Sequence, residues 1–576
     1  MNKVLKGLVA VVSAAAMAIA GFAGAASAMA DPGIAPSYTI TVNETKDNHN
    51  FNAYQVFKGD LKETKDAQGV VTSRTLSNIE WGSGVSDAGK AALYTWAGLS
   101  GTDRTAAKVA EKLATNNGAT TAESFSKTLG TTANLTTSKT ALTQNPGKTA
   151  YSGTVNEAGY YLVVDSKVSA DPADKLADKD AYSAYIMQVV GNVTVDPKSS
   201  VPTVKKEVQD QKDDKDAEST DENGWGNTAD HAIGESFNFR LTATIPANAN
   251  LKAYDSYKVV FNDTMSKGID FEKINSVKVK YGVTTLTLAD HAYTKTEPTT
   301  VTGATDGSKS WSLTIDDLKK VVDKDNPETK FDAAALGTQA ITVEVEYAAH
   351  LNADADVTNK SGASTANKNG VSLDYSNNPN VGGEGDTGHT PGNDVYVYSF
   401  KIDNTKYANA AEPNKELSGA GFTLYKYDQS ADGHKGAPVN FFWDSNKNAY
   451  RPVVSGTETA KTEITSRSED GQKGKFNIIG LDAGKYVLSE TKTPAGYNTV
   501  ADTTIEITAS HKLNNGAPTV DLSKSQNLNN GLVDMPGSNL PSTGGMGTTI
   551  LYVAGAAIVL VAAFGIAFAV RRRNAR

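Results

Sequence analysis

Much of the chain alternates between apolar and polar residues with a period of two. Residues 236–245 (SFNFRLTATI) and 341–347 (ITVEVEY) are clear examples, and such alternation predicts strands with one buried and one exposed face. Threonine is abundant between them, as suits half-exposed strands. Residues 88–97 and 105–114 differ, because they have helical spacing and few β-branched residues. They predict short helices in the first third of the chain.

Clusters of Pro, Gly and Asn divide the 576 residues into segments. They lie at 196–202, 377–393 and 535–539, and proline is excluded from central strands. At roughly 150 residues per domain, the length fits three or four domains. The predicted boundaries are 1–30 for a signal peptide, 31–198, 199–391 and 392–536 for three domains, and 537–576 for a terminal segment. Short strands with frequent turns predict an all-β chain of tandem immunoglobulin-like β-sandwiches.

Both ends of the chain have the pattern of targeting segments. Residues 1–30 contain two lysines, an Ala- and Val-rich run and then ASAMA, which predicts a secretory signal peptide cleaved after Ala28 or Ala30. Residues 550–570 form an uncharged apolar run of 21 residues, long enough for a transmembrane helix. Four arginines follow it and place the end of the chain in the cytoplasm.

Composition excludes several classes of function. The two ends hold six basic and no acidic residues, so the exported body keeps 50 basic and 65 acidic residues, a net charge of −15. Such a surface repels nucleic acid. Cysteine is absent, which excludes thiol catalysis, thiolate metal sites and disulfides. The seven histidines are far apart in sequence, and we expect no metal site and no cofactor.

Two acidic runs have a composition that partly resembles a calcium loop. Residues 209–223 and 444–448 are rich in Asp and Asn, but neither has the ligand spacing and central glycine of a calcium loop. We expect solvated loops there, and calcium binding by them stays open.

A five-residue motif precedes the apolar span. It consists of Leu540, Pro541, Ser542, Thr543 and Gly544. Together with the span and the arginine tail, it resembles the cell-wall sorting signal of Gram-positive surface proteins. The resemblance implies that a sortase cleaves after Thr543 and passes the threonyl carbonyl to an amine. An ordinary membrane anchor is the alternative.

The first domain ends in GNVTVDPK, residues 191–198. This resembles the pilin motif of sortase-assembled shaft pilins, which implies that Lys198 is the acceptor amine. Pro197 removes a ladder donor, so the lysine is expected at a strand edge. Asp196 stands where the family usually has an aromatic residue, and no Trp lies upstream in the motif. The alternative is a lysine in an interdomain turn.

Residues 486–497 (YVLSETKTPAGY) resemble the E-box of pilins and of collagen-adhesin B-type domains. Alternation puts Tyr486, Leu488 and Glu490 on one face, so an acid points into the core, where a carboxylate tends to protonate. The resemblance implies that Glu490 catalyses an intramolecular isopeptide bond. A protonated carboxyl polarises the amide, and desolvation favours the neutral, nucleophilic lysine amine.

The same alternation identifies the reacting lysine of this domain. In residues 400–406 the inward register reaches Lys406 and leaves Lys401 outside. The family's asparagine is replaced by Asp534. We expect a Lys406–Asp534 bond formed with loss of water, and a non-covalent ion pair is the alternative.

The middle domain has a similar pattern. Lys206, Asp263 and Asn377 occupy inward registers in a first, an interior and a last strand. Together they resemble a collagen-adhesin A-type domain, which implies a Lys206–Asn377 bond catalysed by Asp263. Solvated strand ends are the alternative. In the first domain, residues 159–165 resemble a degenerate E-box with Asp165 near the Glu position, and no lysine–asparagine pair is expected.

The motifs together resemble those of a major shaft, or backbone, pilin: a fimbrial subunit polymerised by a class C sortase and anchored to cell-wall peptidoglycan. This resemblance implies a structural protein whose only catalysis is single-turnover isopeptide formation. Its implied partners are sortase, identical subunits, minor pilins, peptidoglycan, and host glycans or extracellular matrix. A monomeric wall-anchored adhesin with the same domains is the alternative. A surface hydrolase is disfavoured, because the sequence has no serine-elbow, metal or phosphate motif. Neither the organism nor the host ligand can be read from the sequence.

Overall fold

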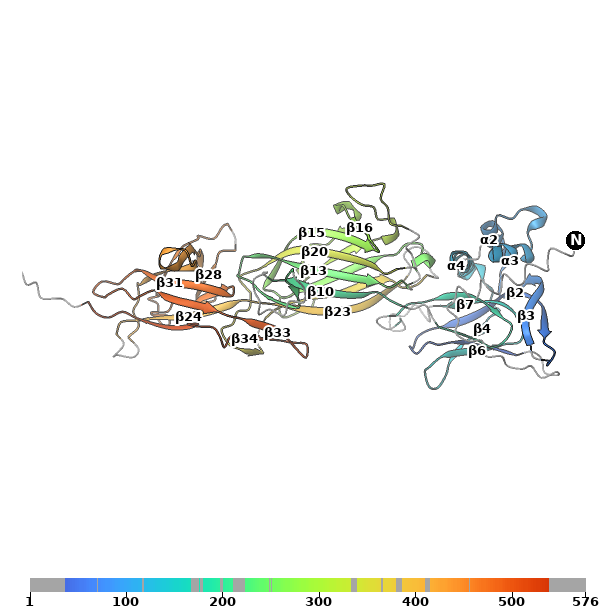
Figure 1. Cartoon of the computed structure of the whole chain (residues 1–576), viewed down its shortest axis with the longest axis horizontal. Helices are drawn as coiled ribbons and strands as arrows, with labels where there is room; N and C mark the ends of the chain where they lie inside the picture. Colours follow the sequence, from blue (N-terminus) through green and yellow to red (C-terminus); the bar gives the residue numbers. More distant parts are fainter. Residues whose placement is uncertain are drawn as a thin grey trace, which may run out of the picture. The chain divides into compact units, whose positions relative to one another are not determined.

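The computed structural model (Figure 1) describes residues 37–537 except 70, 116–118, 167–175, 177–179, 197–199, 211–222, 248, 250, 333–338, 364–365, 380–385, 410–414 and 455. The predicted signal peptide, sorting motif, apolar span and arginine tail lie outside the described residues, and so does Lys198. Among the described residues, no helix is long and apolar enough to span a membrane. The chain divides into two compact units, Met1–Ser399 with Ala509–Asp521, and Phe400–Thr508 with Leu522–Arg576.

The described chain is mostly β-strand, which confirms the all-β class predicted from sequence. Its α-helices are α2 (Asp87–Ala97), α3 (Ala106–Thr115) and α4 (Ala119–Leu129). The first two match the predicted helices. The third was missed because ATTAESFSKTL is rich in Thr and Ser, which have modest helix propensity. Its buried residues Ala122, Phe125 and Leu129 lie at helical spacing, so packing stabilises this helix.

The N-terminal domain contains two sheets. One has the order β5-β6-β1-β9, with β1 (Tyr38–Val42), β5 (Thr143–Gln144), β6 (Tyr151–Val155) and β9 (Val193–Val195). The other has the order β3-β2-β7-β8 with β4 beside β2, and comprises β2 (Phe51–Lys65), β3 (Val71–Trp81), β4 (Thr140–Ala141), β7 (Gly159–Asp165) and β8 (Ala184–Val189). Every residue of β7 is buried. One core packs Leu162 with Phe57 and the helices, and the other packs Val163 with Ile40 and Phe51, so the second sheet is covered on both faces.

The middle domain also contains two large sheets. The first has the order β11-β10-β13-β20-β15-β16, with β10 (Thr203–Gln209), β11 (Trp225–Gly226), β13 (Ser236–Ile245), β15 (Ile269–Tyr281), β16 (Thr284–Thr287) and β20 (Ile341–Leu351). The second has the order β12-β23-β22-β14-β19-β17 with β18 beside β19, and comprises β12 (Thr228–Asp230), β14 (Val259–Met265), β17 (Thr294–Lys295), β18 (Thr299–Thr300), β19 (Lys309–Ile315), β22 (Asn367–Ser376) and β23 (Thr387–Tyr398). The predicted strand 236–245 coincides with β13, in which buried residues alternate with partly exposed ones.

The end of this domain differs from the predicted boundary after residue 391. Strand β23 runs through that position and pairs with β22 and with β12. Pro391 pairs with Ser372 directly beside a register shift that includes Gly392, and proline is tolerated at such a bulge. The middle-domain sheet therefore continues to Tyr398.

The C-terminal domain pairs a sheet of order β27-β28-β30-β24-β35 with one of order β26-β25-β31-β32, with β29 beside β25. Their strands are β24 (Phe400–Tyr407), β25 (Gly421–Tyr427), β26 (Lys435–Pro438), β27 (Phe441–Asp444), β28 (Ala449–Pro452), β29 (Glu463–Thr465), β30 (Ile478–Leu481), β31 (Gly484–Lys492), β32 (Thr503–Ile507) and β35 (Asn529–Val533). A hairpin of β33 (Ser510–Asn514) and β34 (Ala517–Asp521) belongs instead to the first unit. There β34 pairs with β21 (Gly362–Ala363).

Candidate functional site

A buried lysine lies between the two sheets of the middle domain. Lys206 on β10 has no exposed surface, and neither has Asp263 on β14 or Asn369 on β22. Lys206 Nζ donates to Asp263 Oδ2, and lies 2.7 Å from Asn369 Oδ1. The hydroxyl of Tyr347 on β20 lies 2.9 Å from the same amine. The cluster therefore connects four strands.

Tyr347 adds two further hydrogen bonds to this cluster. Its hydroxyl donates to Asp263 Oδ2 at 3.0 Å and accepts from Asn369 Nδ2 at 2.7 Å. Burial raises the pKa of Tyr347 well above its ordinary value, so the hydroxyl keeps its proton. The acid, the amide and the amine are therefore held in one network, and sequence reasoning did not identify this tyrosine as a member of it.

Burial displaces the proton affinities of the cluster. It lowers the pKa of Lys206 to about 8, although the charge of Asp263 opposes this effect. It also raises the pKa of Asp263, against the opposing effect of Lys206. Both displacements favour the neutral amine beside a protonated carboxyl, which is the pair of states that nucleophilic attack on an amide requires.

The structure places Asn377 away from Lys206. Asn377 Nδ2 lies 3.5 Å from the main-chain oxygen of Asp180 in the N-terminal domain. Strands β14 and β22 are antiparallel, with Asp263 opposite Val371 and Met265 opposite Asn369. The N-terminal part of β22 therefore lies next to Lys206. Asn369, in this part of the strand, occupies the position expected for Asn377.

A second buried lysine lies in the C-terminal domain. Lys406 on β24 contacts Asp534, which follows β35, and its Nζ lies 3.3 Å from Glu490 Oε1 on β31. All three side chains are fully buried. The three residues singled out in this domain therefore meet at one point, and the inward register is confirmed, because the side chain of Lys401 is instead partly exposed and pairs with Asp403 at 3.1 Å.

Glu490 has the environment of a carboxyl that tends to hold its proton. Burial raises its pKa, while the Val500 N–H donated at 2.8 Å and the Lys406 amine oppose the shift. The Phe422 ring lies 5.5 Å from Lys406 Nζ and helps to exclude water. Asp534 is held in place by its own N–H, which donates to the Tyr407 carbonyl at 3.0 Å.

The E-box-like strand of the N-terminal domain carries a different cluster. Asp165 Oδ2 lies 2.6 Å from His49 Nδ1, and Asp180 Oδ2 lies 3.1 Å from His49 Nε2. Burial alone would lower the pKa of His49, but hydrogen bonds and charges from the two aspartates raise it to about 10. Asp165 is thus paired with an imidazolium rather than with a lysine.

The proposed acceptor segment follows an edge strand. β9 stands at the end of its sheet and pairs with β1 alone in the strand order. Val195 is buried, and the next side chain, Asp196, accepts from Asn43 Nδ2 at 2.8 Å. The described chain is therefore fastened up to the residue before the Pro197-Lys198 pair, which lies outside the described residues together with Thr543 and the sorting motif.

The acidic run at residues 444–448 forms a turn. Asp444 Oδ1 accepts from the N–H groups of Asn446 and Lys447, and its Oδ2 accepts from Arg451, so it closes a turn. Most of the acidic run 209–223 lies outside the described residues.

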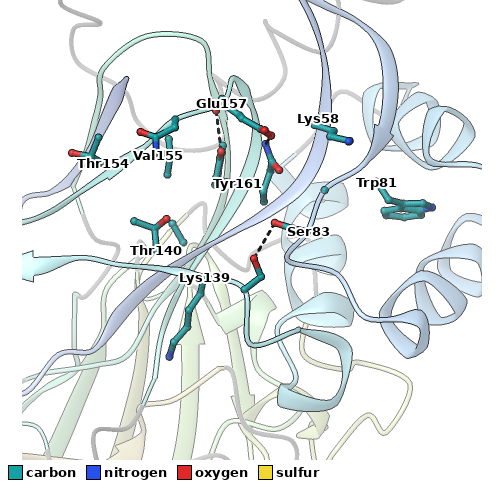
Figure 2. Close-up of a pocket in the computed structure, with 14 residues that line it drawn as sticks. Lys58, Trp81, Ser83, Lys139, Thr140, Thr154, Val155, Glu157 and Tyr161 are labelled. Carbon is teal, nitrogen blue, oxygen red and sulfur yellow. Dashed lines mark hydrogen bonds between the residues drawn. The ribbon is translucent and has the colours of Figure 1, made fainter. Parts of the chain in front are cut away.

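A polar cleft of about 480 Å³ lies on the N-terminal domain (Figure 2). Of its lining residues Glu157 is the only acid. Its Oε2 accepts from Gln55, and its main-chain oxygen accepts from the Tyr161 hydroxyl at 2.9 Å. A pair of carboxylates for acid–base catalysis cannot be assembled from these side chains.

Comparison with known proteins gives one family match. Residues 402–524 match the SpaA prealbumin-like fold domain. This segment contains Lys406 and Glu490 but not Asp534. No curated protein matches the chain.

Several solved structures resemble the chain at low identity. The full-length major pilin SpaD from Corynebacterium diphtheriae is 16% identical, with 87% of this chain and 98% of that chain covered and a TM-score of 0.40. The T6 backbone pilin of serotype M6 Streptococcus pyogenes is 14% identical, covers 89% and 100%, and has a TM-score of 0.46. BcpA, the major pilin subunit of Bacillus cereus, is 14% identical, with 88% of this chain and 99% of that chain covered and a TM-score of 0.37. At these TM-scores the likeness adds no conclusion to those drawn from the chain's own residues.

Proposed function

We propose that this chain is the structural subunit of a covalently polymerised surface pilus. A class C sortase would transfer the Thr543 carbonyl of one subunit to the Lys198 amine of the next, and the last subunit would be joined to peptidoglycan. The observation that carries the proposal is the pair of fully buried lysines, each held against an acid and an amide or second acid. Burying charged groups in an ordinary protein core costs free energy, so we infer that these lysines serve a chemical purpose.

That purpose is one crosslink within the middle domain and one within the C-terminal domain. In the middle domain, Lys206 Nζ attacks Cγ of Asn369, a C–N bond forms, and Nδ2 leaves as ammonia. Asp263, protonated, polarises the amide and relays the amine proton to the leaving group. In the C-terminal domain, Lys406 Nζ attacks Cγ of Asp534 and water leaves, with Glu490 in the same role. Each reaction occurs once per chain, so the protein is not an enzyme that turns over.

The crosslinks suit a subunit that bears load along its length. Lys206 follows the proposed acceptor Lys198 by eight residues in the sequence, and Lys406 and Asp534 bracket most of the C-terminal domain. A bond across each of these two domains would carry tension past the intervening strands, which would otherwise separate. We place the domain boundaries of this subunit near residues 198 and 399.

The proposal is tested on cell-wall extracts boiled in detergent. A covalent ladder of high molecular weight is expected from the wild type, and Lys198→Arg should abolish it while keeping the wall-anchored monomer. Lys205→Arg, a nearby exposed lysine change, is the matched control and should keep the ladder. A single wild-type band would instead indicate the monomeric adhesin, in which the same domains form a stalk.

A further inference from the structure

Three segments far apart in sequence bring metal-ligating atoms together in the first compact unit. Asp210 follows β10, Asp230 ends β12, and His511 lies in the β33–β34 hairpin. His511 Nε2 lies 3.0 Å from Asp230 Oδ2 and 3.5 Å from Asp210 Oδ2. All three residues are buried, and one ligand atom of each lies within 4.8 Å of the other two.

Of the two ring nitrogens of His511, Nε2 faces the aspartates and Nδ1 faces Thr228. Thr228 Oγ1 donates its single hydrogen to the main-chain oxygen of His511 at 3.3 Å. The 2.8 Å contact between Thr228 Oγ1 and Nδ1 then fits an Nδ1–H that donates to the hydroxyl oxygen. In the neutral ring this leaves the lone pair on Nε2, directed at the two carboxylates.

Neighbouring groups support the His511 ring and strand β12, which faces it. The His511 ring stacks on Tyr398 at 5.6 Å between centroids. Tyr398 is the parallel-strand partner of Asp230, so the Tyr398 ring and the Asp230 carboxylate lie on neighbouring strands. Thr228 and Asp230 are two residues apart on β12 and therefore share one face. This gives an outer hydrogen bond and an aromatic support of the kind that orient metal-bound histidines.

We propose that Asp210, Asp230 and His511 bind a divalent transition-metal cation of the Zn²⁺ type. Bonds of about 2.0–2.1 Å in a tetrahedral site separate ligand atoms by roughly 3.3 Å, close to the distances found here. An imidazole suits zinc rather than calcium or magnesium, which prefer all-oxygen sets. The bound cation fastens the β33–β34 hairpin onto the middle-domain strands, across 281 residues of sequence between Asp230 and His511.

A second cluster, Glu44, His49 and Asp180, has equally close ligand atoms but a different occupant. Both ring nitrogens of His49 face carboxylates. The Lys46 amine also lies 3.1 Å from Asp180 Oδ1, where it competes with a metal ion. This ring holds two protons, so the zinc site is assigned to the His511 cluster alone.

The test is a calorimetric titration of the untagged, EDTA-treated chain with ZnCl₂. One zinc per chain is expected in the wild type, with saturable uptake lost in His511→Ala and Asp230→Asn. Thr228→Val removes only the outer hydrogen bond and should weaken zinc binding by about 10- to 100-fold. His291→Ala changes an exposed histidine and should bind as the wild type does. Undiminished uptake in His511→Ala, or none in the wild type, would overturn the proposal.

X-ray absorption on the zinc-loaded wild type keeps the result independent of whether a variant folds. The expected spectrum has one imidazole and otherwise oxygen neighbours at about 2.0–2.1 Å. A spectrum without imidazole, or with several, places the metal elsewhere and contradicts the proposal. A parallel CaCl₂ titration in which calcium binds and zinc does not displace it would also contradict it.

Discussion

Lys206 Nζ and Asn369 Oδ1 lie 2.7 Å apart, although 163 residues separate them in sequence. Neither residue has any exposed surface. A charged amine in such a place loses its hydration, and its lowered pKa records that loss. Condensation with the amide removes the charge altogether and with it the free-energy cost of burying that charge, which favours the reaction.

The first prediction concerns the mass of the intact exported body. It should be lighter than the sequence sum by about 17 Da for ammonia and about 18 Da for water, the losses of the two condensations. Asn369→Ala should lose the 17 Da difference, because it removes the carbon that is attacked. Asn377→Ala should keep it, which makes it the matched control. The reverse pattern would restore Asn377 as the partner, and a mass equal to the sequence sum would exclude both bonds.

This choice of asparagine shows what the sequence could and could not supply. Alternation correctly placed the odd-numbered residues of β22 on the inward face, and Asn369 and Asn377 are both odd-numbered. The end of the strand that meets Asp263 depends on its register with β14. That register is determined by long-range packing, which a period of two does not encode. The C-terminal cluster could be predicted because the inward register of residues 400–406 reaches Lys406 and Asp534 stands where the family usually has asparagine.

The second prediction concerns Glu490→Ala. Tyr486 and Leu488 still supply the apolar face, so the C-terminal domain should fold but lack its crosslink. A bond closing a loop of about 128 residues restricts the unfolded chain by about 5 kcal/mol. The melting temperature of this domain should therefore fall by about 10 °C or more, and trypsin should cleave it faster. Glu506→Ala, at a partly exposed position on β32, should change neither property; wild-type mass and melting in Glu490→Ala would exclude the catalytic role.

The third prediction concerns the hydroxyl of Tyr347. Tyr347→Phe keeps the ring but leaves Asn369 Nδ2 without this acceptor and Asp263 without this donor. A buried hydrogen bond left unmade costs about 1–3 kcal/mol, so crosslink formation should slow by about tenfold or more. Mass spectrometry of freshly synthesised chain at successive times measures the rate. Tyr281→Phe, whose hydroxyl contacts a main-chain oxygen elsewhere, is the control, and equal rates in both variants would reduce Tyr347 to a packing residue.

The fourth prediction concerns pH and His49. Its pKa is raised to about 10 in the folded chain, so the folded state holds a proton that the unfolded state releases near pH 6.5. This contribution to stability is complete below pH 6.5 and is lost as pH rises toward 10. Calorimetry should show the melting temperature of the N-terminal domain falling across that window. In His49→Gln the fall should flatten, and an unchanged slope would mean that other groups cause it.

The clusters around His49 and His511 could not be predicted from the sequence. Each joins residues more than 100 positions apart, and a single histidine without a nearby partner carries no ligand spacing. Tyr347 was likewise invisible as a functional residue, because a tyrosine ending an alternating run reads as core. Sequence patterns identify faces and local motifs, whereas these contacts arise from the pairing of distant strands.

The most direct test of the account is tandem mass spectrometry of the purified polymer after protease digestion. The account predicts a branched peptide in which the Thr543 carbonyl is joined to the side-chain amine of Lys198. Recovery of Thr543 joined only to wall peptide, or to a different lysine of this chain, would contradict it.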